Sequence, residues 1–185
     1  HTTSTIDVVE IDPLYTSIAK QYFKLESNPR LNIYHQDARI FLTDKVASYD
    51  AVFVDVFNGG GSVPFHLATI EAVESIKASL SKQGVVMVNL IGSLAGPGSE
   101  FIQSEIATYE AVFGKVKIFP LESGDEKAVQ NIMLVALSDK DWPKDLPKEA
   151  DLADLMVYEA NVSFLGRRPL TDDWAPVDYW LASIF

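Results

Sequence analysis

The stretch that most constrains the fold is residues 6–13, with the sequence IDVVEIDP. Its β-branched residues are crowded, which is typical of a strand covered on both faces. Asp12 then stands where a helix N-cap belongs, and Pro13 stands at the first helical position. The stretch therefore predicts a buried strand that leads directly into a capped helix.

Glu10 lies at the end of this predicted strand. In nucleoside-binding α/β folds a carboxylate at this position holds a ribose, because an ionised carboxylate accepts hydrogen bonds from both ribose hydroxyls. A strand end with solvated acids has the same pattern. Both interpretations are open on these residues alone.

Apolar periodicity and turn residues divide the rest of the chain into alternating elements. A helix capped by Ser99 is expected to bury Ile102, Ile106, Tyr109 and Phe113 and to stop at Gly114. The other predicted elements are helices at 13–23, 38–42 and 65–81, strands at 31–34, 51–57 and 85–91, a hairpin of strands at 115–121 and 131–137, and a helix around Leu152.

This order predicts an α/β fold, a doubly wound and mostly parallel sheet with helices on both faces. We expect a single truncated domain over residues 1–185, with the sheet and its helices in 6–138 and a C-terminal helix and aromatic tail in 139–185. Ligands of such sheets lie outside the carboxyl ends of the strands. Glu10, Asp37 and Asp55 all fall at or just past predicted strand ends, which indicates a common site.

The net charge of the chain limits the classes of molecule that it is expected to bind. Fifteen basic and 26 acidic residues give a net charge of −11, which argues against nucleic acid and is compatible with a small cationic substrate. A charge that only keeps the protein in solution is the alternative. No apolar run approaches the roughly 20 residues of a membrane helix, so we expect no membrane contact by this segment.

The absence of cysteine excludes disulfides, thiolate metal sites and a cysteine nucleophile, and it fits a reducing compartment, which we expect to be the cytoplasm. The first five residues are polar and contain no signal peptide. Because the chain lacks an initiating methionine, we expect it to be a piece of something longer.

The order of these pieces resembles the spermidine synthase family of aminopropyltransferases, within the S-adenosylmethionine-dependent methyltransferase-like Rossmann fold. The resemblance covers about residues 6–138, and the spacing between its motifs also matches. The tail at 171–177 resembles a divergent branch of synthase-like proteins. The matching stretches are VEIDP at 9–13, NPRL at 28–31, QDAR at 36–39, YDAVFVD at 49–55 and QGVV at 83–86.

The resemblance implies roles for these residues. Glu10, in one motif with Asp12, would hold the ribose of an S-adenosyl nucleoside. Asp37 would accept a hydrogen bond from the adenine amino group, with the Ala38 amide nearby. The co-substrate would be decarboxylated S-adenosylmethionine or S-adenosylmethionine, and no metal is required because the sulfonium supplies the leaving group.

The resemblance also implies that Asp55 is the catalytic residue, in an aminopropyl transfer that belongs to polyamine biosynthesis. A polyamine is protonated at neutral pH, and only its free amine attacks the carbon next to the sulfonium. A carboxylate can bind the ammonium, orient it and take its proton.

Three further residues are candidates for substrate binding. Asn58 stands where the family has a second acid, and a neutral amide cannot take a proton, so polyamine binding is weakened or the substrate differs. His66 follows the glycine loop at 59–61, and Asp173 precedes Trp174, where acid and aromatic ring both suit a cation. A surface histidine and a helix-capping turn are the alternatives for these two.

A second departure concerns the start of the fold. The family begins with a central strand and a glycine-rich turn, for which residues 1–5 are too short. The strands that end at Glu10 and Asp55 then pair directly, or a partner chain fills the slot, or the sheet is rearranged, since unpaired buried backbone groups are costly. We expect this chain alone not to bind the nucleoside well.

Three functions remain open from the sequence. The first is aminopropyl transfer with Asp55 at the reacting centre. The second is a catalytically degenerate binding or scaffold domain, which Asn58 favours. The third is a methyltransferase, since methyl transfer and aminopropyl transfer bind the adenosyl group of the donor in the same way. A homodimer is left open as the assembly state.

Overall fold

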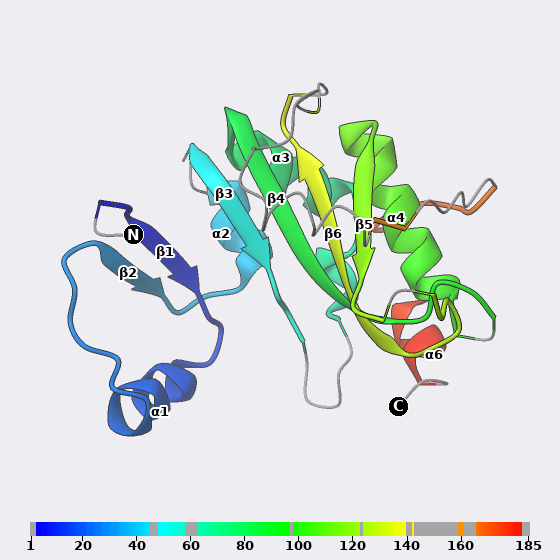
Figure 1. Cartoon of the computed structure of the whole chain (residues 1–185). Coiled ribbons are helices and arrows are strands. Elements are labelled where there is room, and N and C mark those ends of the chain that lie inside the picture. Colours follow the sequence, from blue (N-terminus) through cyan, green and yellow to red (C-terminus); the bar gives the residue numbers. More distant parts are fainter. Residues whose placement is uncertain are drawn as a thin grey trace. The chain divides into compact units, whose positions relative to one another are not determined.

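In the computed structural model, residues 3–44, 48–57, 63–96, 98–122, 124–139, 142, 159–160 and 166–182 are described. The predicted helix around Leu152 and the candidate Asn58 lie outside them. The chain divides into two compact units, an N-terminal unit (His1–Val46) and a C-terminal unit (Ala47–Phe185) (Figure 1). Each unit has a sheet of its own.

The N-terminal unit is a two-stranded parallel sheet with two helices. Its strands run side by side to their ends, where Val9 pairs with Tyr34, so both carboxyl ends lie at one edge. The elements are β1 (Ile6–Val9), α1 (Pro13–Tyr22), β2 (Leu31–Tyr34) and α2 (Ala38–Asp44). They confirm the predicted strand and helix order of this region.

β1 is less buried than its sequence predicts. Ile6 is 54% exposed and Val8 is 39% exposed, and Phe41 is the one buried residue among those described in this unit. The expectation of a strand covered on both faces is therefore wrong for β1. Two short strands and two short helices enclose too little apolar surface to build a core of their own.

The C-terminal unit has a four-stranded sheet in the order β3-β4-β6-β5. β3 and β4 are parallel, and β6 is antiparallel to both of its neighbours, so β5 runs in the same direction as β4. The predicted hairpin of β5 and β6 is confirmed. The strands are β3 (Tyr49–Val54), β4 (Leu80–Gly92), β5 (Val116–Pro120) and β6 (Gln130–Leu137).

Direct pairing between the strand before Glu10 and the strand before Asp55 does not occur. β1 pairs with β2 and β3 pairs with β4, in separate sheets, and each has one neighbour among the described strands. Of the arrangements expected for the start of the fold, direct pairing is therefore wrong.

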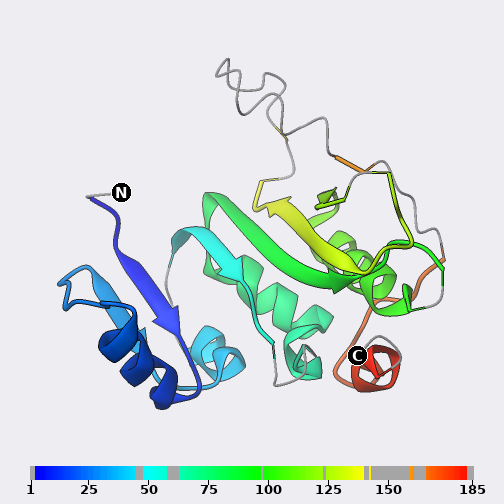
Figure 2. The ribbon, with the colours of Figure 1, turned by 60° about the horizontal axis from the view of Figure 1, so that its bottom comes forward.

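Helices α3 and α4 lie on the same face of the four-stranded sheet (Figure 2). The predicted buried stripe of α4 is confirmed, since its four apolar residues are all at most 1% exposed. Gly114, with φ of 86°, ends α4 as expected. The helical elements are η1 (Phe65–Leu67), α3 (Ile70–Ser79), α4 (Glu100–Phe113) and α6 (Val177–Leu181).

The single helix predicted over 65–81 is instead two elements. Thr69 has an extended backbone between η1 and α3, and its Oγ1 accepts a 3.4 Å hydrogen bond from the Ala72 amide. Threonine competes with helical continuation in this way and favours a cap.

The two faces of the four-stranded sheet differ in burial. The face toward the helices is apolar and buried, with Val86, Val88, Leu90, Ile132 and Leu134 at 2% exposure or less. The opposite face is open, since Phe53 is 71% exposed and Met133 is 37% exposed.

The C-terminal tail packs on α3 and α4. The Ile70 amide donates to the Leu170 carbonyl at 2.9 Å, and the Leu170 amide donates to Thr108 Oγ1 at 2.9 Å. Leu170 and Val177 are fully buried. Within the described part of the chain, no helix combines the length and apolar character needed to cross a membrane.

Candidate functional site

Glu10 and Asp37 each follow a strand that ends at the same edge of the N-terminal sheet. Glu10 follows β1 directly, and its amide donates a 3.0 Å hydrogen bond to the carbonyl of Tyr34, the last residue of β2. Asp37 lies three residues beyond Tyr34. Because β1 and β2 are parallel, both acids belong to the carboxyl edge at which such sheets bind ligands.

The two oxygens of Glu10 differ in what they contact. Oε1 accepts a 2.9 Å hydrogen bond from the Asp12 amide, which fixes the turn after β1. Oε2 has no hydrogen-bond partner among the residues that the structure describes. Oε1 therefore stabilises the turn after β1, and Oε2 can accept a hydrogen bond from a ligand hydroxyl.

Asp12 has a local structural contact. Its Oδ1 accepts a 2.8 Å hydrogen bond from the Leu14 amide and caps α1, with Pro13 at the first helical position. This is the N-cap that the sequence predicts. Asp12 thus also sets the direction in which the chain leaves Glu10.

Asp37 and Ala38 form the start of α2. Asp37 Oδ1 accepts from the amides of Arg39 at 2.8 Å and Ile40 at 3.2 Å. Ala38 is the first residue of α2, and the first amides of a helix have no acceptor within it. At this edge of the sheet, the Asp37 carboxylate and the N-terminal amides of α2 therefore lie next to each other.

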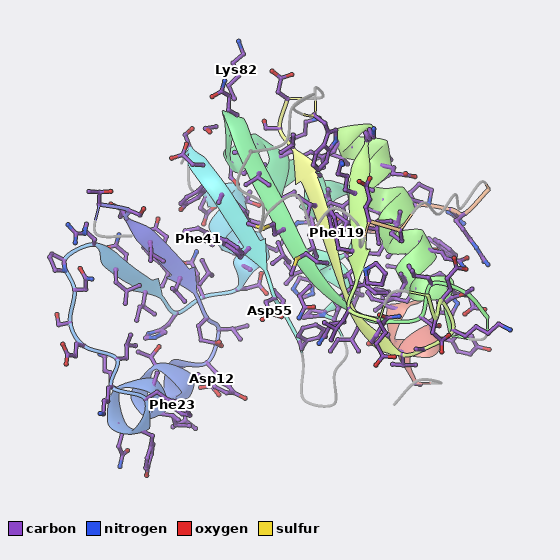
Figure 3. The ribbon with its side chains drawn as sticks, viewed as in Figure 1. Asp12, Phe23, Phe41, Asp55, Lys82 and Phe119 are labelled. Carbon is purple, nitrogen blue, oxygen red and sulfur yellow. The ribbon has the colours of Figure 1, made fainter. Side chains whose placement is uncertain are left out.

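Asp55 lies directly after β3, with its side chain exposed (Figure 3). Its Oδ1 accepts a 3.0 Å hydrogen bond from Asn89 Nδ2 on β4. The register that pairs Val54 with Val88 places these two side chains next to each other. Sequence reasoning missed Asn89, because a lone polar residue inside an apolar strand belongs to no recognisable motif.

His66 lies in η1, partly exposed, with its ring edge-on to Phe65 at a centroid distance of 5.6 Å. The chain between Asp55 and η1 includes Asn58, which is outside the described residues. His66 therefore follows the end of β3 in the chain, as the sequence indicated, and its role in substrate binding stays a prediction.

Of the two tail acids, Asp172 is the one tied to the helices. Its Oδ1 accepts from Thr69 Oγ1 at 2.7 Å. Asp173 is exposed. The face of Trp174 is covered by the Arg168 guanidinium, 4.2 Å from the ring centroid, so the cation beside this ring is one of the protein's own.

A buried acid on α4 was also missed by sequence reasoning. Glu105 is 2% exposed, and its Oε2 has no hydrogen-bond partner among the described residues. Burial raises the pKa of the Glu105 carboxyl well above its ordinary value. Burial and then the charge of Glu105 raise the pKa of Tyr109, one turn further along α4, so both groups favour their neutral forms.

The candidates fall into two groups. Glu10, Asp12, Asp37 and Ala38 lie in the N-terminal unit, and Asp55, His66 and Asp173 lie in the C-terminal unit. Within the described ranges, His, Asp and Glu side chains do not gather in threes as they do around a metal ion. Each group contains a carboxylate at the carboxyl end of a parallel strand.

Comparison with known proteins places this geometry in context. Residues 1–116 match the spermine/spermidine synthase domain. A polyamine aminopropyltransferase of Vibrio vulnificus (strain CMCP6) is 35% identical over 127 residues, which are 66% of this chain and 40% of that protein. The chain thus spans less than half the length of this curated relative.

Two solved structures are similar in fold. A probable spermidine synthase from Corynebacterium glutamicum ATCC 13032 aligns with a TM-score of 0.74 and 20% identity, covering 92% of this chain and 64% of that one. Human methyltransferase-like protein 13 in complex with SAH aligns with a TM-score of 0.65 and 22% identity, covering 85% and 70%. These similarities confirm the predicted α/β fold with a mostly parallel sheet.

Proposed function

The chain belongs to the spermine/spermidine synthase domain family, and we propose that it is the part of an aminopropyltransferase that binds an S-adenosyl nucleoside and an amine acceptor. The observation that carries the proposal is the exposed Asp55 carboxylate at the end of β3, which Asn89 holds by one oxygen. A carboxylate in this position can bind a cationic amine and orient it for reaction.

The N-terminal unit would bind the nucleoside. Glu10 Oε2 is a half-buried acceptor with no partner among the described residues, which fits a ribose hydroxyl. Asp37 and the Ala38 amide at the start of α2 would contact the adenine. The donor would be decarboxylated S-adenosylmethionine, in keeping with the similarity to a polyamine aminopropyltransferase.

The donor supplies an electrophilic carbon next to a sulfonium, whose leaving group is a neutral thioether. The free amine nitrogen attacks this carbon, a C–N bond forms, and the C–S bond breaks with its electron pair left on sulfur. The positive charge passes from sulfur to nitrogen. Asp55 stabilises the charge that grows on nitrogen and accepts one of its N–H groups, and the proton then leaves to solvent.

Methyl transfer is the second candidate. Sequence similarity favours it, because an N-terminal histidine N-methyltransferase of Emericella nidulans is 32% identical over 117 residues, which are 60% of this chain. The same carboxylates would serve, since an amine attacks a methyl carbon on sulfonium by the same displacement. The two candidates differ in the donor and therefore in the nucleoside product.

The experiment uses the protein that carries this sequence, with 1,4-diaminobutane and either donor. We expect methylthioadenosine to form from decarboxylated S-adenosylmethionine. Product from S-adenosylmethionine alone would establish the methyltransferase instead. Nucleoside binding without product from either donor would leave a binding domain.

A matched pair of variants tests in the same assay whether Glu10 binds the donor nucleoside. Glu10→Gln should raise the KM for the donor about tenfold or more, because a charged acceptor of the ribose is lost. Glu26→Gln removes an exposed acid of the same unit and should leave this KM unchanged.

A further inference from the structure

Thr16 on α1 and His35, which directly follows β2, are in side-chain contact. Thr16 Oγ1 lies 3.0 Å from His35 Nε2, within hydrogen-bond distance. The hydroxyl can donate to a neutral imidazole or accept from it, and it can accept from a protonated ring, so the contact does not depend on the state of His35. Neither residue belongs to a stretch that matches the synthase family.

The contact links the two segments that carry Glu10 and Asp37. Glu10 Oε1 accepts from the Asp12 amide, Asp12 caps α1, and Thr16 is the fourth residue of that helix. On the other segment, His35 precedes Asp37 by two residues. The chain that leaves Glu10 is therefore attached, through α1, to the turn that leads into Asp37.

The turn between β2 and α2 has few backbone hydrogen bonds at its start. The amides of His35 and Gln36 have no acceptor among the residues that the structure describes. Further along, Asp37 Oδ1 accepts from the Arg39 amide at 2.8 Å, which ties Asp37 to α2. The His35 side chain is what attaches the start of this turn to α1.

Glu10 has contacts of its own that do not involve this pair. Its amide donates to the Tyr34 carbonyl at 3.0 Å, and its Oε1 accepts from the Asp12 amide at 2.9 Å. Loss of the contact between Thr16 and His35 should therefore displace Asp37 and leave Glu10 in place.

We propose that His35 is a positioning residue that, through Thr16, holds Asp37 in place for the adenine and so sets the selectivity for the base of the nucleoside. This inference rests on the proposed nucleoside binding by the N-terminal unit. A hydrogen bond to the adenine amino group needs its acceptor within a few tenths of an ångström of the right distance. A turn that is free to move loses this bond for part of the time.

The test compares the Kd of 5′-methylthioadenosine with that of the analogue whose purine lacks the 6-amino group, in the protein that carries this sequence. We expect the unmodified protein to prefer the adenine nucleoside about tenfold or more. Thr16→Val and His35→Leu should each reduce this preference to about threefold or less. The two changes together should reduce it no further, because both remove the same contact.

Two further variants separate positioning from a general loss of structure. Thr16→Ser keeps the hydroxyl and should keep the preference. Thr43→Val is the matched control, since Thr43 is exposed and its hydroxyl donates to the Arg39 carbonyl within α2. It should also keep the preference.

The ribose gives a second readout. Removal of the 2′-hydroxyl from the nucleoside should weaken binding by the same factor in Thr16→Val as in the unmodified protein, because Glu10 stays in place. An unchanged base preference in both Thr16→Val and His35→Leu would overturn the inference. Equal losses of base and ribose selectivity would overturn it as well.

The same measurements distinguish this inference from the proposed function. If base selectivity depends on His35 but no transfer occurs with either donor, the proposed transfer fails and the role of His35 stands. If transfer occurs and base selectivity does not depend on His35, the inference alone fails. If the protein shows neither nucleoside binding nor transfer, both fail.

Discussion

Thr69 Oγ1 donates a 2.7 Å hydrogen bond to Asp172 Oδ1, across 103 residues of sequence. Thr69 is fully buried and caps α3, and the Asp172 amide donates to Glu71 Oε2 at 3.1 Å. The start of α3 and the C-terminal tail therefore hold each other in place. This contact lies three residues after His66, so it also anchors the end of η1.

Thr69→Val should lower the free energy of unfolding by about 1–2 kcal/mol, because it removes both the cap and the bond to Asp172. Urea unfolding measures this change. The control is Asp173→Asn, a substitution at the exposed neighbouring acid, which should change stability by less than about 0.5 kcal/mol. Equal effects from the two variants would show that the contact contributes nothing.

Glu105 should make stability fall as pH rises. Burial raises the pKa of its carboxyl in the folded state, so the folded protein binds this proton more tightly than the unfolded chain. The contribution is fully present below the unfolded pKa of roughly 4.3, and it is lost as pH rises toward the folded pKa.

Glu105→Gln should therefore flatten this decline and stabilise the protein at neutral pH by on the order of 1–3 kcal/mol. Thermal unfolding between about pH 4 and pH 8 measures it. Glu100→Gln, at the first turn of the same helix, should leave the decline in place. A decline in Glu105→Gln as steep as that of the unmodified protein would contradict this role of Glu105.

The two units should differ in hydrogen exchange. β1 pairs with one strand and its Ile6 and Val8 are exposed, whereas β4 lies between two strands and has Val86 and Leu90 buried. Amides of β1 should exchange at least about tenfold faster than those of β4, because local opening exposes little apolar surface there. Equal protection in residues 1–185 would show that the N-terminal unit is stabilised by more than its own contacts.

Local signals in the sequence were sufficient for much of the fold. The Asp12 cap depends on contacts within three residues, and the α4 stripe depends on helical periodicity, so both were predictable. Asp55 was found because it follows an apolar strand. These features need no knowledge of what packs against them.

Features that depend on tertiary contacts were not predictable. Glu105 looks like a surface acid in sequence, and its burial is set by the packing of α4. Phe53 looks like a core residue, yet it lies on the open face of the sheet. The contact of Asn89 with Asp55 depends on the register between β3 and β4, which the sequence of either strand does not reveal.

The central claim is that Asp55 holds and orients the reacting amine, and Asp55→Asn tests it most directly in the protein that carries this sequence. The variant should lower kcat/KM for the amine about 100-fold or more while the Kd of the donor nucleoside stays within about threefold. Asp50→Asn, at the start of β3, is the matched control and should keep full turnover, because Asp50 instead accepts a hydrogen bond from Ser81. Turnover of Asp55→Asn within about twofold of the unmodified protein would contradict the account.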